Sequence, residues 1–158
     1  MTKKANKKTV YSKLADLRDN NGFDDIVKAL KEDHKELRTL GETLKSEDAS
    51  DSEKKEAYKN FSSLLKSHAK SEEKAVYAKC CPVDELTQEA EEGYIEHKIA
   101  DNLMKDIATT RNSDKWNAMV KVLAEVVEHH AEEEEKELLP EAALPFRKST
   151  NCSSSLKI

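Results

Sequence analysis

Four long stretches with the 3.6-residue periodicity of amphipathic helices constrain the fold of this chain more than any other feature. They open after Gly22, at Ser50, after Pro82 and at Ser113, and apolar side chains recur on one face of each. Only 3 glycines and 3 prolines occur in 158 residues, which is too few turn residues for a sandwich or a barrel. Because the breaks are short, consecutive helices must run antiparallel. The sequence therefore predicts an all-α fold, an antiparallel up-down-up-down four-helix bundle.

The expected helix ends follow from capping chemistry. Asp24 is the expected N-cap of the first helix, and Ser113 is that of the fourth. Ser50 and Glu53 have the spacing of a capping box, which marks the start of the second helix. Pro140 and Pro145 are expected to end the fourth helix, because proline lacks the N–H that a helix interior needs.

This pattern divides the chain into three expected segments. Residues 24–146 form the bundle, which is long enough to bury a core without disulfides. Residues 1–23 form a basic arm rich in lysine, and residues 147–158 form a flexible, serine-rich tail.

Charge and hydropathy exclude several classes of partner. The formal net charge is −5, which argues against a nucleic acid or an anionic membrane as the main partner. No apolar run approaches the roughly 20 residues of a membrane span, and the lysine-rich N-terminus lacks the apolar stretch of a secretory signal. We expect a cytoplasmic protein that is a monomer or a weak homo-oligomer.

The three cysteines, Cys80, Cys81 and Cys152, support the same compartment. A secreted protein would normally pair its cysteines, whereas the number here is odd and two of them are adjacent. No second cysteine cluster completes a metal set. We therefore interpret Cys80 and Cys81 as incidental thiols rather than as a redox or metal pair.

Each predicted helix places one histidine in its apolar stripe. These four residues are His34, His68, His97 and His130. A core-facing stripe covers three of seven helix positions, so four independent histidines would all fall there with a chance of about 3%. Each lies about 11 to 17 residues from a connecting turn, which places the four imidazoles near one level of the bundle.

Two glutamates share a face with a histidine. Glu72 follows His68 by four residues and Glu134 follows His130 by four, so each points into the core one turn along. A buried carboxylate without compensation costs several kcal/mol. Two carboxylates beside four imidazoles are therefore best explained by cations between them. The neighbouring glutamates are expected on a solvated face instead; they are Glu132, Glu133, Glu135 and Glu137.

An internal repeat selects the register of the fourth helix. His68 and His130 each begin the pattern H-A-x-x-E-E-K. His129 also precedes a glutamate, Glu133, by four residues, but adjacent helix residues point about 100° apart, so both histidines cannot face one site. Aligning the two repeats selects His130 with Glu134 and leaves His129 on the flank of the helix.

Four imidazole nitrogens and two carboxylates form a donor set that suits iron, and less exclusively manganese or zinc. One tetrahedral zinc would leave donors over, and carboxylates that can bridge favour two metals. Ferritin-like di-iron bundles use Glu-x-x-His, whereas this chain has His-x-x-x-Glu. The donor set therefore predicts two metal ions without the ferritin pattern.

In this order the motifs resemble the hemerythrin-like family, specifically its His-His-Glu cation-binding domain. The matching motifs are Asp33-His34, His68-x-x-x-Glu72-Glu73, Glu96-His97 and His130-x-x-x-Glu134-Glu135 followed by Leu138-Leu139-Pro140. The resemblance covers residues 24–146 and implies a four-helix bundle with an oxo- or hydroxo-bridged di-iron centre. By position it implies terminal iron ligands at His34, His68, His97 and His130, and bridging ligands at Glu72 and Glu134.

One position departs from the oxygen carriers of that family. They have a further histidine one turn before the third-helix histidine, and this chain has Gly93 there. Asp101, one turn after His97, or water is expected to fill the position. An open position would bind O2, and it would also admit peroxide or NO.

Three functions are compatible with these residues. The leading one is a non-heme di-iron protein that binds O2 or a related small oxidant for storage, sensing or protection against oxidative or nitrosative stress. The second is a di-iron enzyme that turns over peroxide or NO, with Tyr94 near His97 as a candidate hydrogen-bonding or redox residue. The third is an iron-responsive metal-binding module without redox turnover. The balance of these features leans away from an enzyme.

Overall fold

The computed structural model describes residues 22–81, 84 and 86–143, and every regular element among them is helical. The elements are α2 (Phe23–Lys45), α3 (Asp51–Glu72), the π-helical turn η1 (Glu73–Tyr77), α4 (Ala78–Cys80), α5 (Thr87–Thr109) and α6 (Ser113–Lys136). The predicted all-α class is therefore confirmed for the described part of the chain. The expectations for the arm and the tail, and for Pro145 and Cys152, lie almost wholly outside it.

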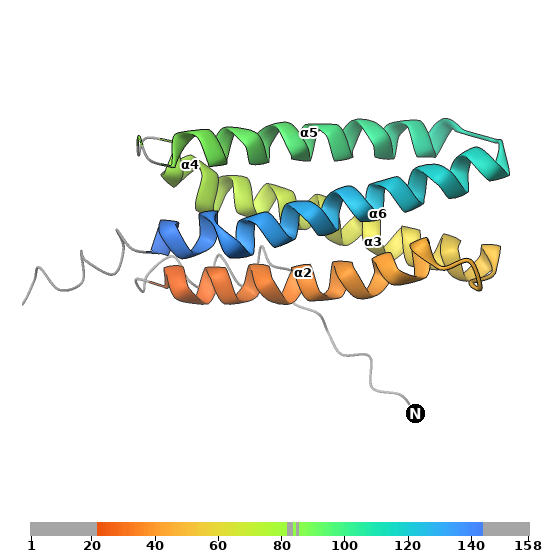
Figure 1. Cartoon of the computed structure of the whole chain (residues 1–158), viewed down its shortest axis with the longest axis horizontal. Coiled ribbons are helices and arrows are strands. Elements are labelled where there is room, and N and C mark those ends of the chain that lie inside the picture. Colours follow the sequence, from red (N-terminus) through yellow and green to blue (C-terminus); the bar gives the residue numbers. More distant parts are fainter. Residues whose placement is uncertain (1–21, 82–83, 85, 144–158) are drawn as a thin grey trace, which may run out of the picture.

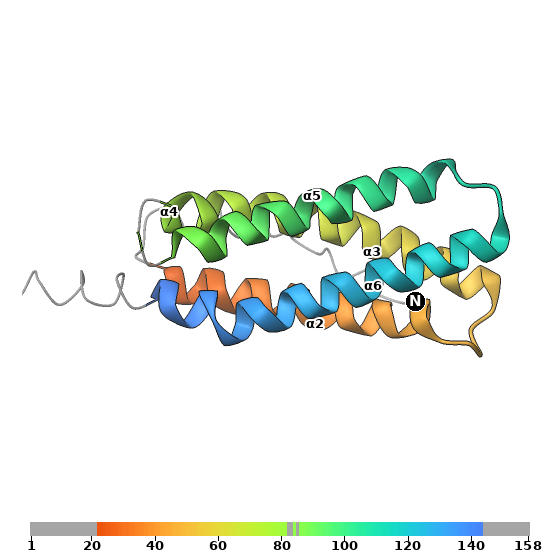
Figure 2. The same ribbon diagram turned by 45° about the horizontal axis from the view of Figure 1, so that its top comes forward.

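The four long helices lie side by side along the long axis of the molecule (Figure 1). The connections after α2 and after α5 lie at one end, and the connection from α4 to α5 lies at the other (Figures 1 and 2). Helix α2 packs against both α3 and α6, and α5 packs against α6. No described helix combines the length and the apolar character needed to cross a membrane.

The N-terminus of α3 is capped as expected, and that of α2 is not. The Glu53 backbone N–H donates to Ser50 Oγ at 3.3 Å, and the Ser50 backbone N–H donates to Glu53 Oε2 at 2.8 Å, which is the predicted capping box. Helix α2 begins at Phe23 with Gly22 at the N-cap position, two residues before the expected N-cap Asp24. Asp24 therefore lies in the first turn, where its negative charge interacts favourably with the positive end of the helix dipole.

Helix α6 differs from expectation at both ends. Asn112, not Ser113, is the N-cap, because its side-chain oxygen accepts a hydrogen bond from the Lys115 backbone N–H at 2.8 Å. The helix ends before Glu137, which has φ −117° and ψ −73°, and the chain is helical again over residues 138–143. The expectation that Pro140 ends the helix is wrong, because the break precedes it and proline is tolerated in the first turn of a helix.

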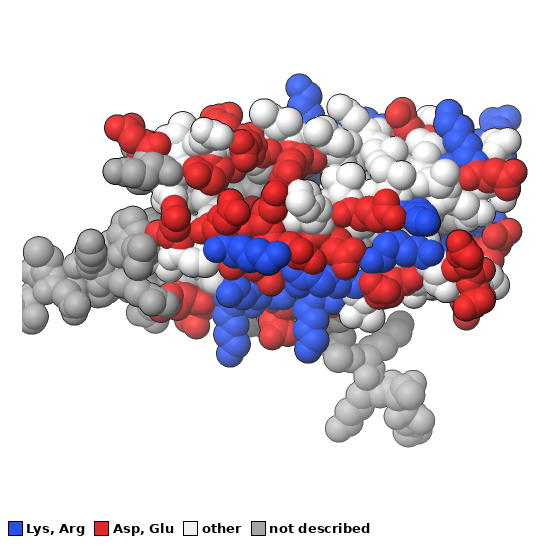
Figure 3. Space-filling model, in the orientation of Figure 1, with Lys and Arg blue, Asp and Glu red and all other residues white. Residues whose placement is uncertain are grey.

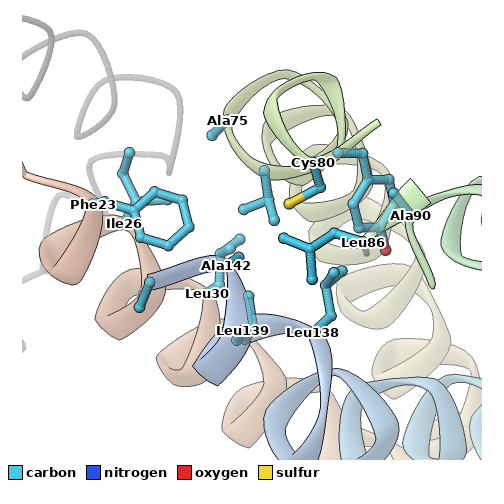
Figure 4. Close-up of a cluster of buried hydrophobic side chains, with 13 residues drawn as sticks. Phe23, Ile26, Leu30, Ala75, Cys80, Leu86, Ala90, Leu138, Leu139 and Ala142 are labelled. Atoms are coloured by element: carbon cyan, nitrogen blue, oxygen red, sulfur yellow. The ribbon is translucent and has the colours of Figure 1, made fainter. Parts of the chain in front are cut away.

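Two apolar clusters fill the bundle and leave a polar layer between them. The first lies near the α4–α5 connection (Figure 4) and consists of Phe23, Ile26, Leu30, Ala75, Val76, Tyr77, Cys80, Leu86, Ala90, Leu138, Leu139, Ala142 and Ala143. The second consists of Leu37, Leu44, Ala57, Phe61, Leu65, Ala100, Met104, Ile107, Val120, Leu123, Ala124 and Val127. Each candidate histidine falls between the two clusters along its helix, as His34 does between Leu30 and Leu37. The apolar clusters thus close the polar layer at both of its ends.

Candidate metal centre

Six side chains from four helices meet in the polar layer, and none of these residues is more than 8% exposed. They are the six residues selected from the sequence: His34, His68, Glu72, His97, His130 and Glu134. Buried charged groups need partners or a metal ion. The atoms that these side chains direct at one another therefore decide what the layer can hold.

The histidines form two pairs that face each other through Nε2. In the α2–α3 pair, His34 Nε2 lies 3.1 Å from His68 Nε2. In the α5–α6 pair, His97 Nε2 lies 3.1 Å from His130 Nε2. Two lone pairs at this separation repel each other unless a proton or a cation lies between them, so each pair is a candidate seat for a cation.

Two inner carboxylates, Glu72 and Glu134, connect the pairs. Glu72 Oε2 lies 3.4 Å from the Nε2 atoms of both His68 and His97. Glu134 Oε2 lies 3.5 Å from the Nε2 atoms of both His34 and His130. Each inner carboxylate thus contacts at least one histidine of each pair, which is the placement that a bridging ligand requires.

Two buried oxygen atoms of the inner carboxylates have no hydrogen-bond partner, Glu72 Oε1 and Glu134 Oε2. Unpaired buried acceptors are costly and rare in native proteins. Within 4.8 Å of one another, the donors form a four-residue group of His34, His68, Glu72 and Glu134 and a three-residue group of Glu72, His97 and His130. Because Glu72 belongs to both groups and acceptor atoms are left over, the residues fit a pair of cations.

Four outer carboxylates contact the histidines on the side away from the centre. Each one forms a hydrogen bond with the Nδ1 atom of one histidine. The pairs are Asp33 with His68, Glu73 with His97, Glu96 with His130 and Glu135 with His34. Such a carboxylate keeps the proton on Nδ1 and turns the Nε2 lone pair toward the centre, as it does in known metal sites. The expectation that Glu135 lies on a solvated face is therefore wrong.

The outer carboxylates explain the internal repeat. The second glutamate of each H-A-x-x-E-E-K motif, Glu73 or Glu135, holds a histidine of a different helix. The acidic residue before each of the other two histidines, Asp33 or Glu96, holds the histidine of the repeat motif. The repeat therefore encodes inner and outer carboxylates together.

Without a metal ion, the carboxylates of the layer raise the pKa of His68 and of His130 and so favour protons on these histidines. Burial lowers the pKa of His68, but the charge of Glu72 and the hydrogen bond with Asp33 outweigh it and raise that pKa to about 10. Burial opposes ionisation of Glu72, yet the His68 charge and the histidine hydrogen bonds lower its pKa well below its usual range. Burial and the charge of Glu72 raise the pKa of Glu134. A metal ion must displace these protons to bind.

The neighbouring histidine is not part of the layer. His129 has a side chain that is 69% exposed and lies 3.1 Å from Glu133, on the surface of α6. His130 is 5% exposed. The structure thus places the two histidines on the sides of the helix that alignment of the repeats predicts.

A tyrosine that the sequence reasoning missed reaches the inner carboxylates. Tyr77 is fully buried, and its hydroxyl donates a hydrogen bond to Glu134 Oε1. The same hydroxyl lies 3.3 Å from Glu72 Oε2 and 3.4 Å from His130 Nε2. The sequence signal was a departure from the repeat, since the position equivalent to Tyr77 in the second motif is Leu139.

The residues expected near the open position lie elsewhere. Asp101 is half exposed and forms an ion pair with Lys105 at 2.6 Å, so it does not join the donors. The Tyr94 hydroxyl donates to the Glu73 backbone carbonyl at 3.4 Å rather than to a candidate ligand. Cys80 is buried outside both donor groups, and burial raises the pKa of its thiol to about 11, which fits the interpretation of an inert thiol.

Two hollows lead from the surface toward the α5–α6 pair. One, of about 340 Å³, lies between α3 and α5 and is lined by residues that include Leu65, Tyr94, His97 and Met104. The other, of about 50 Å³, lies between α5 and α6 and reaches His130 past Glu92 and Glu133. Figure 3 shows acidic side chains gathered on the face of the molecule over α5 and the end of α6. The His97 and His130 side of the polar layer is thus the more accessible one.

The fold and the cluster together define a helical bundle with a candidate cation-binding core. The family description Hemerythrin HHE cation binding domain matches residues 25–142, so the chain belongs to the hemerythrin family of cation-binding domains. Comparisons with curated proteins and with solved structures find no significant match. The resemblance that the four motifs carry is thereby confirmed.

Proposed function

We propose that this protein is a non-heme di-iron protein that binds O2 or a related small oxidant, for storage, sensing or protection against oxidative or nitrosative stress. One observation carries the proposal. In each of two histidine pairs the Nε2 atoms face each other at 3.1 Å, and the two carboxylates between the pairs each have a buried oxygen without a hydrogen-bond partner. In this proposal the four histidines would be terminal ligands, and Glu72 and Glu134 would hold both ions together.

Iron is the proposed metal because the donors are mixed. Imidazole suits iron as well as zinc and copper, and carboxylate oxygens add the harder donors that iron accepts. Bound iron would supply the redox chemistry that the protein side chains lack. The outer carboxylates hold the imidazoles in one tautomer, and the apolar clusters on either side exclude bulk water from the layer.

A second candidate is an enzyme that turns over peroxide or NO. The hollow of about 340 Å³ beside His97 supports it. A small neutral molecule can approach the α5–α6 pair by this route without displacing a helix. The third candidate, a metal-responsive module without redox turnover, is separated from both by its lack of any response to O2. The cytoplasmic location and the monomeric or weakly associated state stay predictions from the sequence.

Admission of O2 to anaerobic, Fe(II)-loaded protein tests the function. We expect about two iron ions per chain and a near-UV and visible absorption that appears with O2 and reverses when O2 is removed. The Zn(II)-loaded protein is the matched control, because it has the same ligands and no redox change. An absorption that does not reverse, together with steady loss of added peroxide, would favour the enzyme. Iron-loaded protein that is indifferent to O2 would contradict both.

A further inference from the structure

The two donor groups of the centre are unequal. The group around the α2–α3 pair has two imidazoles and both inner carboxylates, whereas the group around the α5–α6 pair has two imidazoles and only Glu72. Glu134 Oε2 lies 3.5 Å from His130 Nε2 but does not form a group within 4.8 Å that includes His97, so an ion at the α5–α6 pair has a less compact set of donors than its neighbour. A further oxygen or nitrogen atom at this pair would remove the difference.

The Tyr77 hydroxyl lies at the α5–α6 pair. Its oxygen is 3.4 Å from His130 Nε2, and its ring stacks on the His97 ring with centroids 5.3 Å apart. It also contacts Glu72 and Glu134. The hydroxyl has one proton to donate and three polar atoms around it, so it can donate to only one of them at a time.

Gly93 provides the space that the hydroxyl occupies. A Cβ atom at residue 93 would lie 2.4 Å from Tyr77 Oη and 2.5 Å from Cζ, closer than such atoms approach. No described glycine has a positive φ, so residue 93 is glycine for room and not for backbone conformation. Gly93 and Tyr77 are thus complementary, and the position expected to be open is filled by a side chain of another helix.

The π turn aims Tyr77 at the centre. In a regular α-helix the residue five after Glu72 would point about 140° away from it, because each residue turns about 100°. The chain over Glu73–Tyr77 is π-helical instead, and a residue five along then comes to lie near the starting residue. The Tyr77 hydroxyl thereby reaches the Glu72 carboxylate of the preceding turn at 3.3 Å.

We propose that Tyr77 is an additional metal ligand, through its phenolate oxygen, at the ion held by the α5–α6 pair; this rests on the proposed di-iron function. On ligation the phenol O–H bond breaks, an O–metal bond forms and the proton leaves to solvent, with no change in oxidation state. A phenolate is a hard, anionic donor and stabilises Fe(III) over Fe(II). Tyr77 therefore favours the ferric state of the centre over the ferrous state.

Absorption and resonance Raman spectra of the oxidised, iron-loaded protein test this proposal. We expect a visible phenolate-to-Fe(III) charge-transfer band with tyrosinate vibrations. Tyr77→Phe loses both the band and the vibrations and still binds iron, and its Fe(II) form survives longer in air. Tyr94→Phe is the matched control, because it removes a hydroxyl from the adjacent ring that does not face the inner carboxylates, and it keeps the band.

The possible outcomes distinguish the proposed role of Tyr77 from the proposed di-iron function. Wild-type protein with two iron ions and no tyrosinate signal overturns the role of Tyr77 and leaves the di-iron function standing. Wild-type protein that binds no iron overturns both. If Tyr77→Phe does not fold, ring-deuterated tyrosine in the Tyr11→Phe/Tyr58→Phe/Tyr94→Phe variant, in which Tyr77 is the one tyrosine left, gives the answer, since a shifted vibration there supports Tyr77 and an absent one refutes it.

Discussion

His130→Ala should remove at least one of the two iron ions per chain and abolish the visible absorption, whereas His129→Ala should keep both. His130 is buried and directs Nε2 at His97 and at both inner carboxylates. Loss of an outer partner of a ligand typically weakens metal binding 10–100-fold, so loss of a ligand itself should cost more than about 100-fold. Iron analysis after desalting, with a titration of each variant, measures the difference.

His129→Ala is a close control for that experiment. It makes the same chemical change one residue away, on a side chain that is 69% exposed and paired only with Glu133. Because His130 is buried and His129 is exposed, helix content measured by circular dichroism must be shown to be the same in both variants before iron loss is assigned to the missing ligand. Iron loss in His129→Ala with retention of iron in His130→Ala would show that α6 binds the metal through His129 and not through His130.

Chelation of the metal should leave a protein whose stability falls as the pH rises from 7 to 10. The pKa of His68 is raised from its unfolded value of 6.5 to about 10. Its contribution to stability is therefore fully present below pH 6.5 and lost as the pH rises through 10. The raised pKa of Glu134 has the same sign, and its contribution is lost as the pH rises above the ordinary glutamate value of 4.5.

The metal-loaded protein should show the opposite trend over the same range. Metal ions compete with protons for the imidazoles, so they bind more tightly as the pH rises. At a free metal concentration 100 times Kd, binding adds about 2.7 kcal/mol of stability, which is roughly 5–10 °C in Tm for a chain of this size. Thermal melts of both forms at several pH values measure this gap, and curves that stay parallel would contradict proton occupancy of the centre.

Local spacing explains what could be predicted from the sequence. A core-facing histidine and a glutamate four residues later share a helix face by geometry alone, so His68 with Glu72 and His130 with Glu134 could be selected without knowing the fold. The same holds for the Ser50 capping box, which is complete within four residues. The helical class followed from periodicity repeated four times.

Contacts between helices explain what was missed. Glu135 holds His34 across 101 residues of chain, and no spacing rule connects positions so far apart. Tyr77 was missed because the π turn over Glu73–Tyr77 departs from the 3.6-residue period on which the helical pattern rests. Gly93 was recognised as a departure from the oxygen carriers, but only the folded structure reveals that the ring of Tyr77 takes that space.

The location of the metal tests the central claim most directly. Crystals of the iron-loaded protein, measured at the iron absorption edge, should give two anomalous peaks in each molecule. We expect one peak between the Nε2 atoms of His34 and His68 and the other between those of His97 and His130, both in contact with Glu72. A single peak, or two peaks outside this polar layer, would contradict a di-iron centre held by the four buried histidines.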